Sequence, residues 1–393
     1  MCIPDSGLLL VDKPQGVTSH DVVACARHLL HTKRVGHAGT LDPMATGLLI
    51  IGFGYATRLM NYMLGHDKTY EAVIRLGEAT TTDDAEGEVL SERVIGLGPG
   101  VKINSKDKLL SEIFETDFSK NNLQNSNTKT ELLNKTFQRI KQVIKENLTG
   151  EIMQAPTAFS AIKINGQRAY DLAREGKTVE LESREINIYS FDISNPLIST
   201  GVSGRKVLDV MATVSCSSGT YIRALARDLG RLLGVGGHLV KLRRTSIGDF
   251  SVKSTQVLRL NSETREFTDR NGIVQKRSKA VPPSNFDTKK DLPKSLLTMM
   301  QAAEHTLPTF LVDKNQAQDL RFGRWICLNS TDSFNNLDSY PAIAYSYDEL
   351  TGEYDVVSVV EQVKNKNCEQ IKPIVVFPAD EKPGKIKKSS ILQ

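Results

Sequence analysis

The feature that most constrains this chain is a loop at residues 35–47 that runs directly into an apolar segment at residues 48–51. The loop holds three glycines, one proline and a single carboxylate, Asp42, and the segment after it is typical of a buried strand. Asp42 is therefore expected to lie beside the core. Pro43 has a fixed φ and disfavours the helical region for Asp42, so a stiff backbone presents the carboxylate. Because Asp-Pro pairs commonly begin turns, a purely structural turn is an equally good interpretation of the loop alone.

Length and composition limit the class of protein. The chain has 393 residues, 39% of them hydrophobic, which is enough for two or three domains with buried cores. It contains neither an apolar run of about 18 residues nor a signal-peptide pattern, so we expect a cytoplasmic protein with no membrane partner. Its five cysteines are scattered and form no CxxC motif, which predicts reduced thiols and no metal site. Since the formal net charge is only +4, a nucleic-acid partner would require locally concentrated positive charge.

Periodic patterns predict both strands and helices. Residues 7–11 form an apolar strand segment, after which Thr18 is placed to cap a helix. Residues 70–77 alternate in polarity, and period two places Tyr70 on the buried face of that strand. A tyrosine on a core face usually serves packing, so the pattern alone favours a packing role for Tyr70.

The placement of Arg223 predicts an ion pair. An alternating strand at residues 208–216 ends in a turn, and a helix then begins with Arg223 in its first turn. A cation there opposes the helix dipole, so we expect a nearby anion to compensate it, and Asp42 is the candidate. Arg227 and Arg231 follow on the same face at i, i+4 spacing and are candidates for contacts to an RNA backbone.

Several motifs together resemble the TruB family of tRNA pseudouridine synthases. They are D-K-P-x-G-x-T-S at residues 12–19, G-H-x-G-T-L-D-P-x-A-T-G at 36–47, K-x-Y at 68–70, T-x-T-x-D-x-x-G at 80–87, Q-x-P-x-x-F-S-A-x-K at 154–163 and G-T-Y-I-R at 219–223. They are spread over most of residues 7 to 250, which makes the resemblance specific. Phe159 departs from the pattern, because tyrosine is frequent at that position.

The resemblance implies roles for individual side chains. It makes Asp42 the catalytic nucleophile, Tyr70 an active-site residue and Arg223 the partner of the catalytic aspartate. Further residues are implied to bind substrate, namely His37, which would contact the extruded nucleotide, Thr40 in the same loop, Tyr221 and Leu242 as walls of the pocket, and Lys13. For Lys13, the sequence favours the alternative role of bracing the active-site loop.

The resemblance also implies an α+β fold with a mixed or antiparallel-sheet catalytic domain, flanking helices and a small C-terminal β-rich domain of the PUA-like kind. We expect the catalytic domain at residues 1–255, with a polar insertion at about 91–130. Residues 256–293 are charged and contain proline, which predicts a linker or disordered insert. Short strands then predict the β-rich RNA-binding domain at residues 294–380, followed by a basic tail at 381–393.

The function implied is isomerisation of uridine-55 in the T arm of tRNA to pseudouridine, by base flipping and an aspartate nucleophile. This isomerisation can proceed without a cofactor or metal, and we expect tRNA as the partner, with no obligate protein partner. Attack on the ring, attack on the sugar carbon and elimination are all compatible with a carboxylate at Asp42. Two alternatives are a guide-RNA-dependent pseudouridine synthase and a tRNA-binding folding chaperone whose catalysis is secondary or absent.

Overall fold

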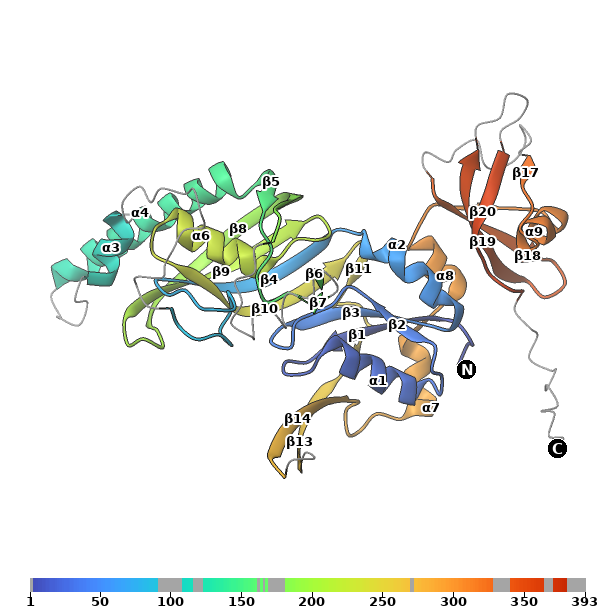
Figure 1. The fold of residues 1–393 in the computed structure, drawn as a ribbon, viewed down its shortest axis with the longest axis horizontal. Helices are drawn as coiled ribbons and strands as arrows, with labels where there is room; N and C mark the ends of the chain where they lie inside the picture. Colours follow the sequence, from blue (N-terminus) through green and yellow to red (C-terminus); the bar gives the residue numbers. More distant parts are fainter. Residues whose placement is uncertain are drawn as a thin grey trace.

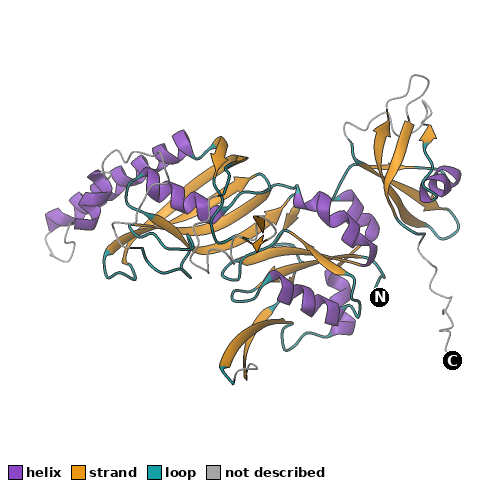
Figure 2. Cartoon of the chain, in the orientation of Figure 1, coloured by secondary structure: helices purple, strands orange, loops and turns teal. Residues whose placement is uncertain are grey.

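The computed structural model describes residues 3–90, 108–115, 123–160, 163–164, 167–168, 181–268, 272–327, 340–363 and 370–379. They form a large mixed sheet with helices packed against it and a smaller β-rich unit at the C-terminal end (Figure 1 and Figure 2). The predicted α+β architecture with a C-terminal β-rich unit is therefore confirmed. No helix in the described ranges is long and apolar enough to span a membrane.

The main sheet has eleven strands and runs in the order β12-β1-β3-β10-β4-β9-β8-β5, with β2, β11 and β15 paired at its sides. Neighbouring strands are mostly antiparallel, but β1 runs parallel to β12 and β3 runs parallel to β10. The strands are β1 (Gly7–Lys13), β2 (Val35–Ala38), β3 (Thr46–Phe53), β4 (Lys68–Leu76), β5 (Gly150–Gln154), β8 (Arg184–Thr200), β9 (Lys206–Cys216), β10 (Gly237–Ile247), β11 (Phe250–Ser251), β12 (Leu258–Arg259) and β15 (Leu296–Thr298).

Helices cover the main sheet along its length. They are α1 (Ser19–Leu29), α2 (Met60–Leu64), α3 (Lys108–Glu115), α4 (Leu123–Asn147), α6 (Ile222–Leu232), α7 (Thr288–Asp291) and α8 (Met299–Glu304), with 3-10 turns η1 (Gly54–Leu59) and η3 (Leu292–Ser295). Helix α1 begins as predicted, because the Thr18 hydroxyl accepts from the Asp21 N–H while the Asp21 carboxylate accepts from the Thr18 N–H.

Strands β1 and β3 are buried on both faces, which explains their continuous apolar sequences. In β1, Leu8 and Leu10 belong to the core beneath η1, α2 and α8, whereas Leu9 and Val11 belong to the core beneath α1. Residues 48–51 of β3 also alternate between these two cores. The predicted buried strand after the Asp42 loop is therefore confirmed, and the loop is attached to the most deeply buried part of the sheet.

The C-terminal unit is a five-stranded sheet of order β16-β18-β19-β20-β17 with one helix. Its elements are β16 (Thr309–Leu311), α9 (Lys314–Arg321), β17 (Ile326–Cys327), β18 (Ala342–Asp348), β19 (Glu353–Val363) and β20 (Gln370–Val376). Ile343, Val359 and Phe377 share a hydrophobic core with Leu8 and Met60. The unit is therefore packed against the main sheet rather than attached only by a linker.

The prediction of a linker or disordered insert at residues 256–293 is wrong. This segment contains β12, which pairs with β1, and a hairpin of β13 (Asn261–Thr268) and β14 (Val274–Val281), followed by α7 and η3. The hairpin is exposed on both faces, so its sequence carries no alternation that would mark it as a sheet. Of this segment, Leu258, Leu260, Ala280 and Leu292 are buried in the core beneath α1, and this small number of buried apolar residues explains the low hydrophobicity of the segment.

Two further boundaries differ from expectation. Residues 294–308 belong to the main sheet rather than to the C-terminal unit, because β15 pairs with β1 and α8 packs beside it. In the expected insertion at 91–130, residues 108–115 form α3 and α4 begins at residue 123, so helical structure extends into the polar stretch. Residues 91–107 and 116–122 of that insertion, and the basic tail at 381–393, lie outside the described residues.

Candidate active site

A cavity of about 850 Å³ opens between the loop after β2, the start of α6, and strands β4 and β10. Six of the residues predicted for the site line this cavity, although they come from distant parts of the chain: Thr40, Asp42, Tyr70, Tyr221, Arg223 and Leu242. His37 and Lys13 are not among its lining residues. The cavity lies where the strand order brings β4 and β10 next to each other.

Asp42 and Arg223 form an ion pair in this cavity, as the sequence predicts. The Nε of Arg223 lies 3.0 Å from Oδ2 of Asp42, and Nη2 donates to Oδ1 at 3.3 Å. Arg223 is 6% exposed, and its remaining donors reach the Asp84 carboxylate at 3.3 Å and the carbonyl oxygens of Thr82 and Phe159. The cation at the start of α6 is thus compensated by two carboxylates.

The groups around Asp42 have opposing effects on the pKa of its carboxyl group. Burial raises the pKa of the Asp42 carboxyl above its ordinary value, and the negative charge of Asp84 acts in the same direction. The positive charges of Arg223 and Lys13 lower the pKa and so favour the carboxylate. Asp42 nevertheless keeps 38% of its side chain exposed, so the carboxylate is accessible from the cavity.

Tyr70 lies on the buried face of β4, as its period-two position predicts, and lines the cavity. It is directly opposite Arg244 in the pairing of β4 with β10. Burial raises the pKa of the Tyr70 hydroxyl, and the positive charge of Arg244 acts in the opposite direction. Tyr70 therefore packs against the core and lines the cavity at the same time.

With this geometry established, comparison with known proteins identifies the family. The sequence model described as the N-terminal domain of TruB family pseudouridylate synthases matches residues 27–98 and 102–222, and the model of the tRNA pseudouridylate synthase B C-terminal domain matches residues 223–268. A tRNA pseudouridine synthase B from Bifidobacterium longum (strain NCC 2705) is 43% identical over 95% of this chain and 98% of the relative. The chain belongs to the TruB family.

Other TruB-family relatives and solved structures agree with this assignment. The tRNA pseudouridine synthase B of Arthrobacter sp. (strain FB24) is 38% identical over 97% of this chain and 99% of its own length. Among solved structures, a Cbf5-Nop10-Gar1 complex matches with a TM-score of 0.55 and 22% identity, covering 95% of this chain and 84% of the matched chain. An archaeal box H/ACA sRNP Nop10-Cbf5 complex matches with a TM-score of 0.53 and 21% identity, covering 95% and 87%. At these identities, the structural matches establish a shared fold only.

Lys13 supports the TruB-family loop from behind. Its Nζ donates to the carbonyl oxygens of Val17 at 2.7 Å, Pro14 at 3.0 Å and Pro43 at 3.3 Å, and the residue is fully buried. Burial lowers the pKa of Lys13 from 10.5 to about 8. Ser19 adds a second brace, since its hydroxyl accepts from the Leu41 N–H at 2.9 Å. These contacts favour the bracing interpretation of Lys13 over substrate contact.

His37 lies in β2, just before the Asp42 loop and outside the cavity lining. Its ring stands edge-on to that of His20, with 5.8 Å between the centroids. Its buried Nδ1 has no hydrogen-bond partner within the part of the chain that the structure describes. Burial, followed by the neighbouring charges of His20 and Arg244, lowers the pKa of His37, so its imidazole is neutral near pH 7.

Sequence reasoning missed several charged residues that line the cavity, among them the buried Asp84 and Arg244. Arg244 is 1% exposed, and its guanidinium donates to the carbonyl oxygens of Leu48 and Gly39 at 2.8 and 2.9 Å. Period two along β10 places it on the same face as Leu242, and that signal could have identified it. Asp84 occupies the aspartate position of the 80–87 motif, which was a direct signal.

Arg227 has protein partners rather than a free guanidinium. It contacts the carboxylates of Asp83 and Asp228 at 3.3 and 3.0 Å and donates to the carbonyl oxygen of Ala155 at 2.7 Å. These contacts hold α6 to the loop after β4 and to the segment after β5. They indicate a structural role for Arg227, in contrast to the RNA-backbone contact considered from its sequence position.

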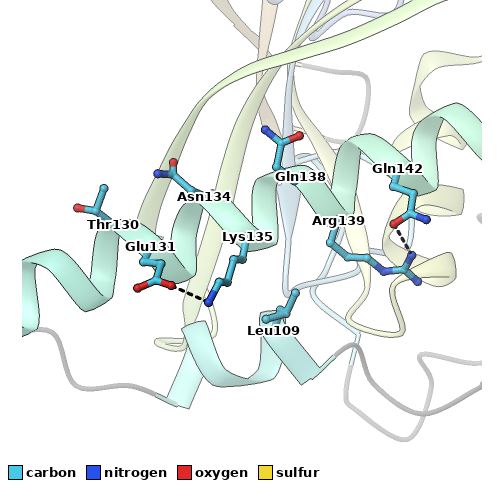
Figure 3. A pocket seen from close by; sticks show the side chains of 8 residues that line it. All are labelled: Leu109, Thr130, Glu131, Asn134, Lys135, Gln138, Arg139 and Gln142. Atoms are coloured by element: carbon cyan, nitrogen blue, oxygen red, sulfur yellow. Dashed lines mark hydrogen bonds and ion pairs between the residues drawn. The ribbon is translucent and has the colours of Figure 1, made fainter.

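A second hollow lies between α3 and α4 and contains none of the predicted site residues (Figure 3). Its side chains include the pair Glu131 and Lys135, whose charged atoms are 2.7 Å apart, and they project from the exposed surfaces of the two helices. Both members of this pair are more than 60% exposed, whereas the guanidinium that pairs with Asp42 is buried. The cavity around Asp42 is therefore the candidate active site.

Proposed function

We propose that this chain isomerises uridine-55 in the T arm of tRNA to pseudouridine, taking the flipped base into the cavity around Asp42. The observation that carries the proposal is the ion pair of Asp42 with a buried Arg223 at the wall of that cavity. The names of the TruB-family relatives, tRNA pseudouridine synthase B, support tRNA as the substrate.

The reaction requires no net oxidation or hydrolysis. The bond between N1 of uracil and C1′ of the ribose breaks, the base turns over, and a bond forms between C5 and C1′. The proton on C5 is lost and N1 regains a proton, so atoms and electrons balance within the nucleotide and solvent. The protein must supply a nucleophile, a proton carrier and an orienting cation.

Asp42 is the proposed nucleophile, and Arg223 is proposed to orient it. A guanidinium that contacts both carboxylate oxygens restricts rotation of the carboxylate as well as favouring its charge. The further contacts of Arg223 with Asp84, Thr82 and Phe159 fix the guanidinium itself. The carboxylate would thus meet the nucleotide in one orientation, which lowers the entropy cost of reaction.

Tyr70 is the proposed proton carrier. Its raised pKa keeps the hydroxyl neutral near pH 7, and a neutral hydroxyl can accept one proton while donating another. Arg244 lies across the strand pair from it and favours transient negative charge on the oxygen. With Leu242 on the same strand as Arg244, these residues would form the wall against which the uracil ring lies.

Base flipping is part of the proposal, because a stacked uridine cannot reach a carboxylate inside a cavity. Extruding a base costs roughly a few kcal/mol, which contacts in the space it leaves can offset. His37 is proposed to enter that space. It lies on β2 immediately before the loop that presents Asp42, and Thr40 of that loop is exposed at the cavity.

The test is label release from an unmodified tRNA transcript that carries tritium at uracil C5. Purified protein alone is expected to release close to one equivalent per tRNA, and a transcript with cytidine at position 55 should release none. Release that requires an added RNA or protein would refute stand-alone action. Release that persists with the cytidine-55 transcript would refute the assigned position.

A further inference from the structure

The exposed face of α1 is almost free of negative charge. His20, Ala24, Arg27 and His28 project from it to solvent, and the following turn adds exposed Lys33 and Arg34. Residues 19–37 contain a single acidic residue, Asp21, and its carboxylate is already bonded to Thr18. Since the whole chain carries a formal net charge of only +4, much of its unbalanced positive charge is concentrated on this face.

The β13–β14 hairpin extends this face outward. It projects from the body of the molecule beside α1, and Arg277 reaches Asp21 across the junction at 3.3 Å (Figure 1). Its two described strands carry four exposed cations, Arg265, Lys276, Arg277 and Lys279, and two carboxylates, Glu263 and Glu266. A hairpin exposed on both faces contributes little to a core, so core packing does not explain why the chain contains it.

Two arginines of the hairpin are placed against each other. Arg265 and Arg277 are directly opposite in the strand register, and both are more than 60% exposed. Like charges in directly opposed positions weaken a strand pair. Glu263 and Asp21 compensate one arginine each, yet the cations along the strands still outnumber the carboxylates. A polyanion bound along the hairpin would neutralise this excess of positive charge.

The cationic face is continuous with the candidate active site at one end. The Gly16 N–H donates to the carbonyl oxygen of Pro43 at 2.8 Å, which joins the loop before α1 to the Asp42 loop. A Cβ added at Gly16 would lie 3.8 Å from the hydroxyl oxygens of Ser262 and Ser278, so the hairpin lies beside that same loop.

At its other end the face leads to the C-terminal unit. The guanidinium groups of Arg34 and Arg58 stack on Tyr55, 4.6 and 5.3 Å from the ring centroid. Arg58 also donates to the carbonyl oxygen of Val376 at the end of β20. A guanidinium placed over an aromatic ring can still bind phosphate oxygens through N–H groups that the ring does not occupy.

We infer that the exposed face of α1 and the β13–β14 hairpin form one surface that binds the phosphate backbone of the tRNA stem next to the target loop. The identity of the RNA rests on the proposed function. A double-stranded stem offers a regular row of phosphates, and its grooves in A-form geometry are contacted mainly through the backbone. A surface of separated cations that leads away from the active-site loop suits this substrate.

The test uses three double variants of the full-length chain, each losing two positive charges. Arg27→Gln with Lys33→Gln alters the α1 face, and Lys276→Gln with Lys279→Gln alters the hairpin. The matched control is Lys135→Gln with Lys145→Gln on α4, which packs at the opposite end of the main sheet (Figure 1). Binding of an unmodified tRNA transcript is measured over a salt series, together with single-turnover label release at saturating protein.

The helix and hairpin variants are each expected to weaken tRNA binding roughly tenfold and to reduce the salt slope by about 1 to 2, with the saturated rate unchanged. The control should bind within about twofold of the parent chain. Equal affinities in all variants would overturn the inference, and so would a loss in only one of the two, because one surface should respond at both places. If the parent chain binds through this surface but releases no label, the proposed function fails and the inference stands.

Discussion

Arg223 contacts Asp42 through two nitrogens on one side of its guanidinium, with Nε 3.0 Å from Oδ2 and Nη2 3.3 Å from Oδ1. The third nitrogen, Nη1, is left to face Asp84 and the Thr82 carbonyl oxygen. Arg223 therefore connects the carboxylate in the cavity to a buried carboxylate behind it. A lysine could supply the charge of this group but could not reach all of these partners.

Arg223→Lys should slow turnover more than it weakens tRNA binding. The ammonium keeps a positive charge near Asp42 but offers no planar pair of donors, so orientation is lost. We expect a fall in the single-turnover rate of roughly 10²-fold and a change in Kd of less than about fivefold. A double-mutant cycle gives the control: Arg223→Ala combined with Asp42→Ala should be no slower than Asp42→Ala alone. Additive losses would show that Arg223 acts independently of Asp42.

Asp42→Asn should abolish turnover while leaving tRNA affinity within about tenfold of the parent chain. The amide is similar in shape but is not a nucleophile, whereas most binding energy for RNA comes from phosphate contacts elsewhere. Single-turnover label release and a binding titration on the same preparation measure the two effects. Turnover within tenfold of the parent chain would remove Asp42 from the nucleophile role.

Tyr70→Phe should preserve the fold but slow the reaction by roughly 10²-fold. The ring still fills its position on the buried face of β4, and only the hydroxyl opposite Arg244 is lost. The single-turnover rate at saturating protein is the measurement, and circular dichroism checks the fold. An unchanged rate would leave Tyr70 with a packing role alone.

Asp84→Asn should move the acid limb of the kcat/KM profile to lower pH. The charge of Asp84 raises the pKa of Asp42, so its removal lowers that pKa and keeps Asp42 ionised in more acidic solution. The neighbouring Asp83→Asn is the control, because Asp83 pairs with Arg227 rather than Arg223. A limb that stays in place or moves to higher pH in the Asp84 variant would contradict the assignment of this limb to Asp42.

Lys13→Met should destabilise the chain, and the difference from the parent should grow with pH. Three carbonyl oxygens lose their donor, which costs about 2 to 4 kcal/mol. Burial lowers the pKa of Lys13 from 10.5 to about 8, so between these values the unfolded chain binds more protons than the folded chain. The parent therefore gains stability as pH rises through this window, by at most about 1.4 kcal/mol per pH unit.

Urea unfolding of both chains at pH 7.0 and 9.5 measures this difference. Other titrating groups are common to the two chains and cancel when their free energies of unfolding are subtracted. A gap that is constant or narrows with pH would mean that the Lys13 ammonium is not destabilised by its surroundings.

Local patterns were sufficient to predict much of the site. Period two placed Tyr70 on the buried face of its strand, and the unfavourable position of Arg223 at a helix start indicated an anionic partner. Arg244 was not predicted, although it lines the same cavity as Tyr70 and Arg223. Its importance depends on the register that sets it opposite Tyr70, and a register between strands about 170 residues apart is not a local property of either strand.

The segment at residues 256–293 shows that composition alone can predict disorder where the chain is folded. Polar residues on both faces of the β13–β14 hairpin resemble a disordered stretch in composition, because neither face carries a core. The segment is stabilised by contacts at both of its ends. At one end β12 pairs with β1, and at the other Ala280 and Leu292 pack in the core beneath α1. These contacts involve few residues and leave little trace in hydrophobic periodicity.

The pairing of β1 with β12 and β15 has a consequence for synthesis of the chain. One edge of β1 is formed by β3, which follows soon after, but the other edge is completed only by residues 258–259 and 296–298. At ribosomal rates of about 5–20 residues per second, that edge waits roughly 10 to 60 s for its partners. Throughout that interval the nascent protein presents the open edge of an apolar strand, a template for unwanted strand addition. The Asp42 loop beside β3 therefore reaches its final support only after about three quarters of the chain has been synthesised.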